Sequence, residues 1–325
     1  MAEPDRPDQS TPAYPIGATR TAIMTVEELT ISAQTSMSAV TLRVSDLAGM
    51  SRYYENALAL SPLEERSRGR EVHRVLGRLG TPLLRLVSTP DLPPVDPRQA
   101  GLFHTAFLFD SQADLAATVF RAAQEPRSRF AGSSDHLVSE AFYFTDPEGN
   151  GIELYWDRDR GSWHYAHGEI QMDTIYLDPN AYLKTHLAGD PTETASLHAG
   201  RVGHVHLQVG DLETARRFYV DAVGFAATLA SFPGALFASA GGYHHHVAMN
   251  TWNSAGAGPR AASLGLGQVA ISVPGREDLD ALAARLRTAS VDFRDDGNVV
   301  TAFDPWGTEV SISLPEASAE ELLAR

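Results

Sequence analysis

The chain repeats one sequence pattern at an offset of 165 residues, and this internal repeat limits its possible folds more than any other feature. Residues 39–47 read AVTLRVSDL and residues 204–212 read HVHLQVGDL, with Val, Leu, Val, Asp and Leu in common. The alignment continues without a gap, so that Tyr54 falls on Tyr219. In both copies an alternating apolar pattern is followed by apolar residues at helical spacing. Each copy therefore predicts a strand followed by a helix.

Two further segments repeat at an offset of 164 residues and complete a set of four units. Residues 101–107 (GLFHTAF) align with residues 265–271 (GLGQVAI), and a Leu/Ala-rich segment follows each. Asp-Pro turns at Asp146 and Asp304 come later in the same two units. A strand, a helix and several short strands in each unit predict an α+β fold of four βαβββ modules, and not a doubly wound sheet.

The repeats divide the chain into two halves that a polar segment joins. Residues 1–36 are expected to be a disordered N-terminal extension, and residues 37–157 to form modules 1 and 2. A linker is expected over residues 158–200, modules 3 and 4 over residues 201–314, and a C-terminal tail over residues 315–325. Asp46 and Asp211 precede the predicted helices of modules 1 and 3, where each is expected to cap the first helical turn. The extension lacks the apolar core of a signal peptide, so the cytoplasm is the expected compartment.

The composition argues against several classes of function. With 26 Lys and Arg against 41 Asp and Glu, the formal net charge is −15 and no basic run appears, so no nucleic-acid partner is expected. The longest stretch without charged side chains, residues 222–259, is interrupted by Gly, Pro and His, so no membrane span is expected. The chain has no cysteine, so any metal must be bound by His, Asp or Glu.

Four phrases in the sequence carry a family resemblance. They are Gly-His-x-x-x-x-Val-x-Asp-Leu at 203–212, Leu-Phe-His at 102–104, Asp-Pro-x-Gly-Asn-x-x-Glu at 146–153 and Tyr-His-His-His at 243–246. Together with the modules, they resemble the vicinal oxygen chelate superfamily, and within it the extradiol (catechol 2,3-) dioxygenases, over residues 37–314. The resemblance implies two bowl-shaped mixed sheets, a mononuclear non-haem Fe(II) site with Mn(II) as the alternative ion, and a small aromatic diol and O₂ as substrates.

The same resemblance implies a histidine on the first strand of a module and a glutamate on its last strand, seven residues beyond the Asp of the Asp-Pro turn. Applied module by module, this pattern selects His104, Glu153 and His204 as metal ligands. Two histidines and one carboxylate form the facial triad of non-haem Fe(II) sites. Because these ligands come from modules 2 and 3, those modules are expected to share one sheet, and modules 1 and 4 the other. His206 has the same facing as His204 and is the rival ligand.

Three more residues fall near positions that act in catalysis in this family. Tyr143 matches a tyrosine whose hydroxyl contacts the bound catecholate. His246 matches a histidine that acts as acid and base beside O₂, and alternation places His244 on its face and His245 on the opposite one. His136 is a further catalytic candidate, with a spacing that differs from the family pattern by a couple of residues.

Two other functions use the same scaffold. A glyoxalase-like isomerase or lyase would bind its metal through four ligands, of which His204, Gln268 and Glu309 could supply part, but Ser311 at the matched position argues against this set. A metal-free protein that sequesters a small molecule, such as a drug, is the other alternative. Modules 1 and 4 lack a full ligand set and already have that character. For the oligomeric state, a homodimer is the default expectation.

Overall fold

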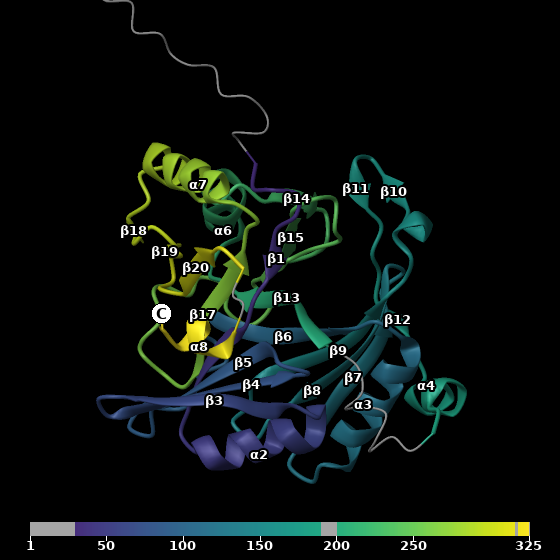
Figure 1. Ribbon diagram of the computed structural model, residues 1–325. Coiled ribbons are helices and arrows are strands. Elements are labelled where there is room, and N and C mark those ends of the chain that lie inside the picture. The colour runs from purple at the N-terminus through teal and green to yellow at the C-terminus, as the bar shows by residue number, and fades with distance from the viewer. Residues whose placement is uncertain (1–29, 190–199, 316–317, 325) are drawn as a thin grey trace, which may run out of the picture.

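The computed structural model describes residues 30–189, 200–315 and 318–324, and within them the chain forms two mixed β-sheets of nine strands each, with helices packed on them (Figure 1). This is the expected α+β fold. The modules also pair as expected, because modules 2 and 3 contribute to one sheet and modules 1 and 4 to the other. Most of the predicted disordered extension, up to residue 29, lies outside the described residues.

Modules 2 and 3 form the sheet that we call the site sheet. At its centre β6 (Gly101–Phe109) pairs antiparallel with β13 (Gly200–Gln208). On either side, β9 (Gly151–Asp157) pairs parallel with β6, and β16 (Val247–Asn250) pairs parallel with β13. The outer strands beside β9 and then beside β16 are β8 (Ser139–Thr145), β7 (Arg129–Asp135), β12 (Ile175–Tyr176), β15 (Ala235–Ser239) and β14 (Ala226–Leu229).

Modules 1 and 4 form the second sheet in the same way. At its centre β2 (Val40–Val44) pairs antiparallel with β17 (Gly265–Ser272), to which the short β1 (Ser36–Met37) also pairs. The outer strands, first beside β2 and then beside β17, are β5 (Thr81–Ser88), β4 (Glu71–Arg78), β3 (Ser61–Arg68), β20 (Glu309–Ser313), β19 (Val299–Phe303) and β18 (Phe293–Asp295).

Each module has helical structure after its first strand. Asp46 caps α2 (Leu47–Leu58) by accepting a hydrogen bond from the Gly49 amide, as predicted, and Ser111 caps α3 (Gln112–Gln124). In module 4 the helix is α7 (Arg276–Thr288). No helix in the described part of the chain is long and apolar enough to span a membrane.

The predicted helix of module 3 changes its geometry partway along. Asp211 caps α6 (Leu212–Arg216) as expected, but the chain then continues as a π-helical turn, η2 (Arg217–Ala222). The amide of Val223 donates to the Phe218 carbonyl, five residues back, at 2.9 Å. Phe218 and its neighbour Tyr219 are both buried in this wider turn.

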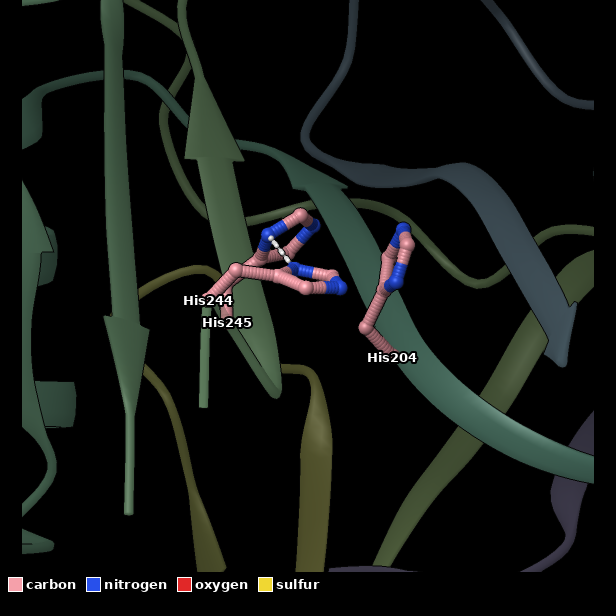
Figure 2. Close-up of side chains that lie close together, drawn as sticks. All are labelled: His204, His244 and His245. Atoms are coloured by element: carbon pink, nitrogen blue, oxygen red, sulfur yellow. Dashed lines mark hydrogen bonds between the residues drawn. The ribbon is translucent and has the colours of Figure 1, made fainter. Parts of the chain in front are cut away.

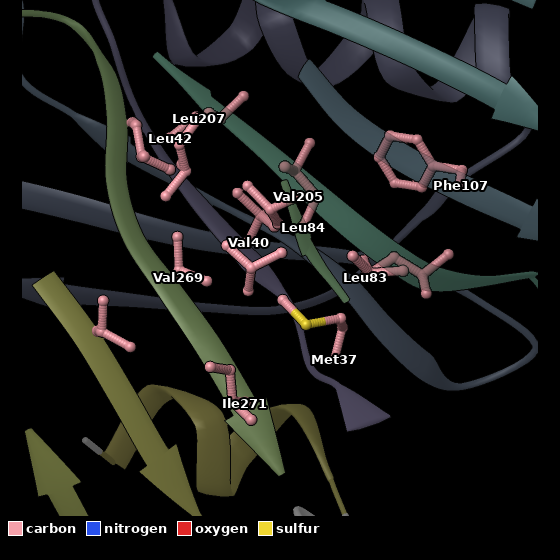
Figure 3. Close-up of a cluster of buried hydrophobic side chains, with 14 of the residues drawn as sticks. Met37, Val40, Leu42, Leu83, Leu84, Phe107, Val205, Leu207, Val269 and Ile271 are labelled. Atoms are coloured by element: carbon pink, nitrogen blue, oxygen red, sulfur yellow. The ribbon is translucent and has the colours of Figure 1, made fainter. Parts of the chain in front are cut away.

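The two sheets share one hydrophobic core. Figure 3 shows side chains from the central strands of both sheets in this core, among them Val40, Val269, Phe107 and Val205. Successive residues of a strand point to opposite faces. Because Val205 points into the core, its neighbours on β13 point away from it, onto the outer face of the site sheet.

The segments expected as a linker and a tail contain regular structure. Residues 158–200 include a β-hairpin, β10 (Tyr165–Ala166) with β11 (Glu169–Ile170), then β12 on the site sheet and α4 (Pro179–His186). In the tail, α8 (Ala319–Ala324) covers the second sheet, where Leu322 and Leu323 are buried against Ala39 and Val75. The apolar residues in these two segments occur in short stretches between polar residues. Such stretches show too little periodicity to predict helices or strands.

A repeated buried hydrogen bond joins the modules within each half. The hydroxyl of Tyr54, on the module 1 helix, donates to Oδ2 of Asp146, in the Asp-Pro turn of module 2, at 2.8 Å. The hydroxyl of Tyr219 donates to Oδ2 of Asp304 at 3.0 Å in the other half. The aligned tyrosines and the two Asp-Pro turns therefore form the same hydrogen bond in both halves of the chain.

Removing the Tyr54 hydroxyl is expected to destabilise the protein mainly above pH 6. Burial raises the pKa of Asp146 from 3.8 to about 6, so the folded state favours the protonated carboxyl group. This contribution to the free energy of unfolding is fully present below pH 3.8 and is lost as the pH rises through 6. Tyr54→Phe leaves the ionised carboxylate without one donor, at a cost of about 2 kcal/mol at pH 8 and less at pH 5. Urea unfolding at both pH values measures this difference.

The matched control is Tyr53→Phe, because Tyr53 is also buried but bonds the neutral hydroxyl of Ser128 at 3.1 Å. This control is expected to cost about 1 kcal/mol at both pH values. Equal losses for Tyr54→Phe at pH 5 and pH 8 would contradict the role given to Asp146.

Candidate active site

Three side chains from neighbouring strands of the site sheet converge on its outer face. Oε2 of Glu153, on β9, lies 2.8 Å from Nε2 of His104, on β6, and 3.1 Å from Nε2 of His204, on β13. All three side chains are at most 7% exposed. The structure thus brings together the three residues that the sequence selected as metal ligands.

The donor set of this cluster fits a divalent transition metal. Burial lowers the pKa of His204 to about 4, so its imidazole is neutral at pH 7. Burial alone would raise the pKa of Glu153, but the adjacent His204 and His104 hold that pKa well below its usual value, so the carboxylate is ionised. Nε2 of His104 is buried, and its 2.8 Å contact with Oε2 of Glu153 does not have the geometry of a hydrogen bond. A metal bound to both atoms would offset the cost of burying this nitrogen without a hydrogen bond.

His206, the rival ligand, does not belong to the cluster. The side-chain amide of Asn250 donates to Nε2 of His206 at 3.0 Å, so this nitrogen already has a partner. The imidazole packs 5.0 Å from the ring of Phe103 and 5.4 Å from that of Trp252, measured between ring centres. His206 therefore acts as one wall of the space above the cluster.

A cavity of about 520 Å³ opens above the three residues. One side is polar and includes Ser133, Ser134, His136 and Tyr143, whereas the other is aromatic and includes Phe103, His206, Phe232, Phe237 and Trp252. The indole of Trp252 is 46% exposed, and its N–H donates to the Pro233 carbonyl at 3.0 Å. No Lys or Arg of the described residues lines this cavity.

Tyr143 and His136, two of the predicted catalytic residues, line this cavity as a hydrogen-bonded pair. Nδ1 of His136 lies 2.6 Å from the Asp173 carbonyl, so Nδ1 carries the proton and donates it. Nε2 of His136 then accepts from the Tyr143 hydroxyl at 2.7 Å. Burial, with the nearby negative charge of Glu153, raises the pKa of Tyr143 well above its usual value, so the hydroxyl keeps its proton.

His246, the third predicted catalytic residue, lies away from the cavity, and His245 lines it instead. Nδ1 of His246 accepts from the Ala240 amide at 3.2 Å, and its ring stacks on Phe225. The ring centre of His245 lies 4.0 Å from that of His204. As alternation predicts, His245 and His246 face different sides, but the side that meets the cavity is that of His245, which the family match did not select.

His204, His244 and His245 form a second cluster with enough nitrogens to bind a metal (Figure 2). Their hydrogen bonds give another explanation. Nδ1 of His244 and Nδ1 of His245 lie 2.8 Å apart, and Nε2 of His244 lies 2.9 Å from Oδ1 of Asp157. Both nitrogens of His244 therefore have hydrogen-bond partners. Asp157, His244 and His245 form a hydrogen-bonded chain that ends at the cavity, and His204 touches this chain only through ring contacts.

The residues proposed for a four-ligand isomerase site are not assembled. Gln268 and Glu309 lie on β17 and β20 of the second sheet, where the Gln268 amide donates to Oε1 of Glu309 at 2.7 Å. His204 lies in the site sheet, so it cannot share one ion with them.

Gly203, in the Gly-His phrase, makes room for a buried tyrosine beside His204. A Cβ at this position would lie 1.7 Å from the Tyr155 hydroxyl. That hydroxyl is 2.7 Å from the hydroxyl of Tyr243, which donates to Oδ2 of Asp157 at 2.8 Å. The sequence marked this glycine only as part of a motif, because Tyr155 meets it from another strand.

Gly203→Ala is expected to displace Tyr155 and shift His204, lowering stability by about 1–3 kcal/mol and weakening the binding of an added divalent metal. Urea unfolding and metal content after anaerobic incubation with Fe(II) measure the two effects. Gly267→Ala is the matched control, because Gly267 precedes Gln268 as Gly203 precedes His204, and an added Cβ there meets Thr41 at 3.1 Å and Arg43 at 3.6 Å. Metal binding by Gly203→Ala equal to that of the wild-type protein would contradict the link between this glycine and the cluster.

Comparisons with known proteins agree with this architecture. A family model described as Glyoxalase/Bleomycin resistance protein/Dioxygenase superfamily matches residues 36–154 and 201–312. Catechol-2,3-dioxygenase of Bacillus subtilis (strain 168) is 34% identical over 269 residues, which cover 81% of this chain and 92% of the relative. Biphenyl-2,3-diol 1,2-dioxygenase 3 of Rhodococcus globerulus is 33% identical over 117 residues, 33% of this chain and 60% of that protein. The crystal structure of glyoxalase I from Zea mays has a similar fold, with a TM-score of 0.52 at 17% identity, covering 86% of this chain and 92% of that one.

Proposed function

We propose that this chain, which belongs to the glyoxalase/bleomycin resistance protein/dioxygenase superfamily, is an extradiol dioxygenase that opens a catechol-type ring with O₂ at a mononuclear Fe(II) site. The observation that carries the proposal is the convergence of His104, Glu153 and His204 at one end of a cavity. Two imidazoles and one carboxylate are the ligand set that leaves positions on Fe(II) open for substrate. The similarity to catechol-2,3-dioxygenase over most of the chain supports the same reaction class.

The charge of the proposed ligand set suits a catecholate. Two neutral imidazoles and the Glu153 carboxylate leave one net positive charge on a divalent ion, which a catecholate monoanion would neutralise. When bound, Fe(II) would lower the pKa of a diol hydroxyl and supply the redox chemistry through which O₂ reacts with an aromatic ring. Both oxygen atoms of O₂ would enter a ring-opened semialdehyde product.

The polar groups of the cavity would then handle the substrate and its proton. The Tyr143 hydroxyl donates a hydrogen bond to Nε2 of His136. A lone pair of the Tyr143 hydroxyl oxygen therefore remains free to accept a hydrogen bond from a substrate hydroxyl. His245 lies in the cavity, where the free nitrogen of a neutral imidazole could accept a proton from the substrate. We therefore propose His245 as the acid–base residue in place of His246.

Iron binding and oxygen uptake test this function. Protein prepared without O₂ is expected to bind about one Fe(II) per chain and to consume O₂ on addition of catechol, with a yellow product. His204→Gln is expected to lose the iron and the uptake, because the replacement lacks the imidazole. His206→Gln, on the same strand and face, is the control and is expected to keep the iron, because its side-chain oxygen can still accept from Asn250.

Other outcomes of the same measurement favour the alternatives. Tightly bound zinc with no oxygen uptake would favour a glyoxalase-like isomerase or lyase. Wild-type protein that binds no metal would favour a sequestering protein. A manganese-loaded enzyme that consumes O₂ would leave the reaction class intact and change only the ion.

The lining of the cavity favours an uncharged catechol. A substrate carboxylate buried there would meet no described Lys or Arg and would lie near Glu153 and Asp173. Burying such an unpaired charge costs several kcal/mol. We expect kcat/KM for 4-methylcatechol to exceed that for 3,4-dihydroxybenzoate by about 100-fold.

A positively charged side chain in the cavity lining is expected to reduce the ratio of kcat/KM for 4-methylcatechol to that for 3,4-dihydroxybenzoate. Met172 lines the cavity, so Met172→Lys would place an ammonium group where a substrate carboxylate could pair with it. Met172→Leu is the control and is expected to keep the wild-type ratio. An equal rate for both substrates in the wild-type enzyme would contradict the proposed selectivity.

A further inference from the structure

A chain of hydrogen bonds connects the cavity to a carboxylate behind it. Asp157 is the last residue of β9, four residues beyond Glu153. Its Oδ2 accepts from the Tyr243 hydroxyl at 2.8 Å, and its Oδ1 lies 2.9 Å from Nε2 of His244. Nδ1 of His244 then lies 2.8 Å from Nδ1 of His245, the contact drawn in Figure 2.

The donors and acceptors along this chain can be assigned in order. A carboxylate only accepts, so Nε2 of His244 carries a proton and donates it to Asp157. If His244 carries only this proton, its Nδ1 accepts from Nδ1–H of His245, which is the arrangement that the nitrogen NMR below tests. The remaining nitrogen of His245, Nε2, is left without a proton.

We propose that Asp157 and His244 are positioning residues, which hold the imidazole of His245 in the Nδ1–H tautomer so that its Nε2 can accept a proton in the cavity. This role rests on the proposed function, because it matters only if His245 receives a substrate proton. Neither residue lines the cavity, so both act through His245 and not on the substrate.

The surroundings of the chain support orientation over metal binding. His244 is 1% exposed and His245 is 7% exposed, and the ring centres of these neighbours are 4.6 Å apart. Without a fixed partner at Nδ1, a neutral imidazole exchanges between two tautomers, and only one of them presents a bare Nε2. A carboxylate that fixes the first imidazole therefore fixes the second one as well.

Nitrogen NMR of histidine-labelled, iron-free protein tests the tautomer directly and needs no activity. We expect His244 to carry its proton on Nε2 and His245 on Nδ1, with signals assigned by their loss in His244→Gln and His245→Gln. In Asp157→Asn the side-chain amide can donate to Nε2 of His244, so both tautomers are expected to reverse. A proton on Nε2 of His245 in the wild-type protein, or no change in Asp157→Asn, would overturn the proposal.

Steady-state kinetics of the iron-loaded enzyme provide the second test. Asp157→Asn is expected to lower kcat for catechol by about 100-fold, the range for losing one acid–base group, while KM stays within about threefold. Asp157→Glu is expected to recover part of kcat. Asp159→Asn is the matched control, because this carboxylate caps the short helix η1 (Arg160–Ser162), outside the chain, and is expected to leave kcat unchanged.

The two tests separate the possible failures. If Asp157→Asn loses iron in proportion to its activity, its role is structural and the positioning proposal is wrong. If the wild-type protein binds iron but consumes no O₂ with any catechol, the proposed function fails, while the tautomer measurement still decides whether Asp157 orients His245.

Discussion

The antiparallel pairing of β6 with β13 is the contact on which the candidate site depends. It joins a strand of module 2 to a strand of module 3, and it places His206 directly opposite His104. Because Val205 is fixed in the core shared by the two sheets, the histidines on either side of it must face outwards. A shift of one residue along β13 would bury two imidazoles and expose the core residue, so the core determines the register of the ligands.

The second sheet shows what the same topology becomes without ligands. At the strand positions that correspond to His204 and His104 it carries Ala39 and Gln268. Part of its outer face is covered by α8, whose leucines pack on Ala39 and Val75. The two sheets therefore share a core and a strand order but differ at their outer faces. The outer face of the site sheet borders a cavity, whereas that of the second sheet makes an apolar contact with α8.

Much of the fold could be predicted, because internal repeats carry information over long distances. The pattern implied by the family resemblance, applied module by module, selected His104, Glu153 and His204, and a shared sheet for modules 2 and 3 followed from that choice. The proposed acid–base histidine was harder to place, because three consecutive histidines precede β16 and of these only His245 lines the cavity. The hydrogen-bonded chain through Asp157 could not be predicted, since it joins side chains 87 residues apart whose contact no local pattern records.

The candidate site lies across the boundary between the two similar halves of the chain. Each half supplies strands to both sheets, and neither half holds all three candidate ligands. A polypeptide of half this length would have to pair with a second copy of itself, and would then form two identical sheets. In a single chain the two halves need not be identical, so one sheet can carry the histidines and a cavity while the other has Ala39 and Gln268 at the matching positions and packs against α8.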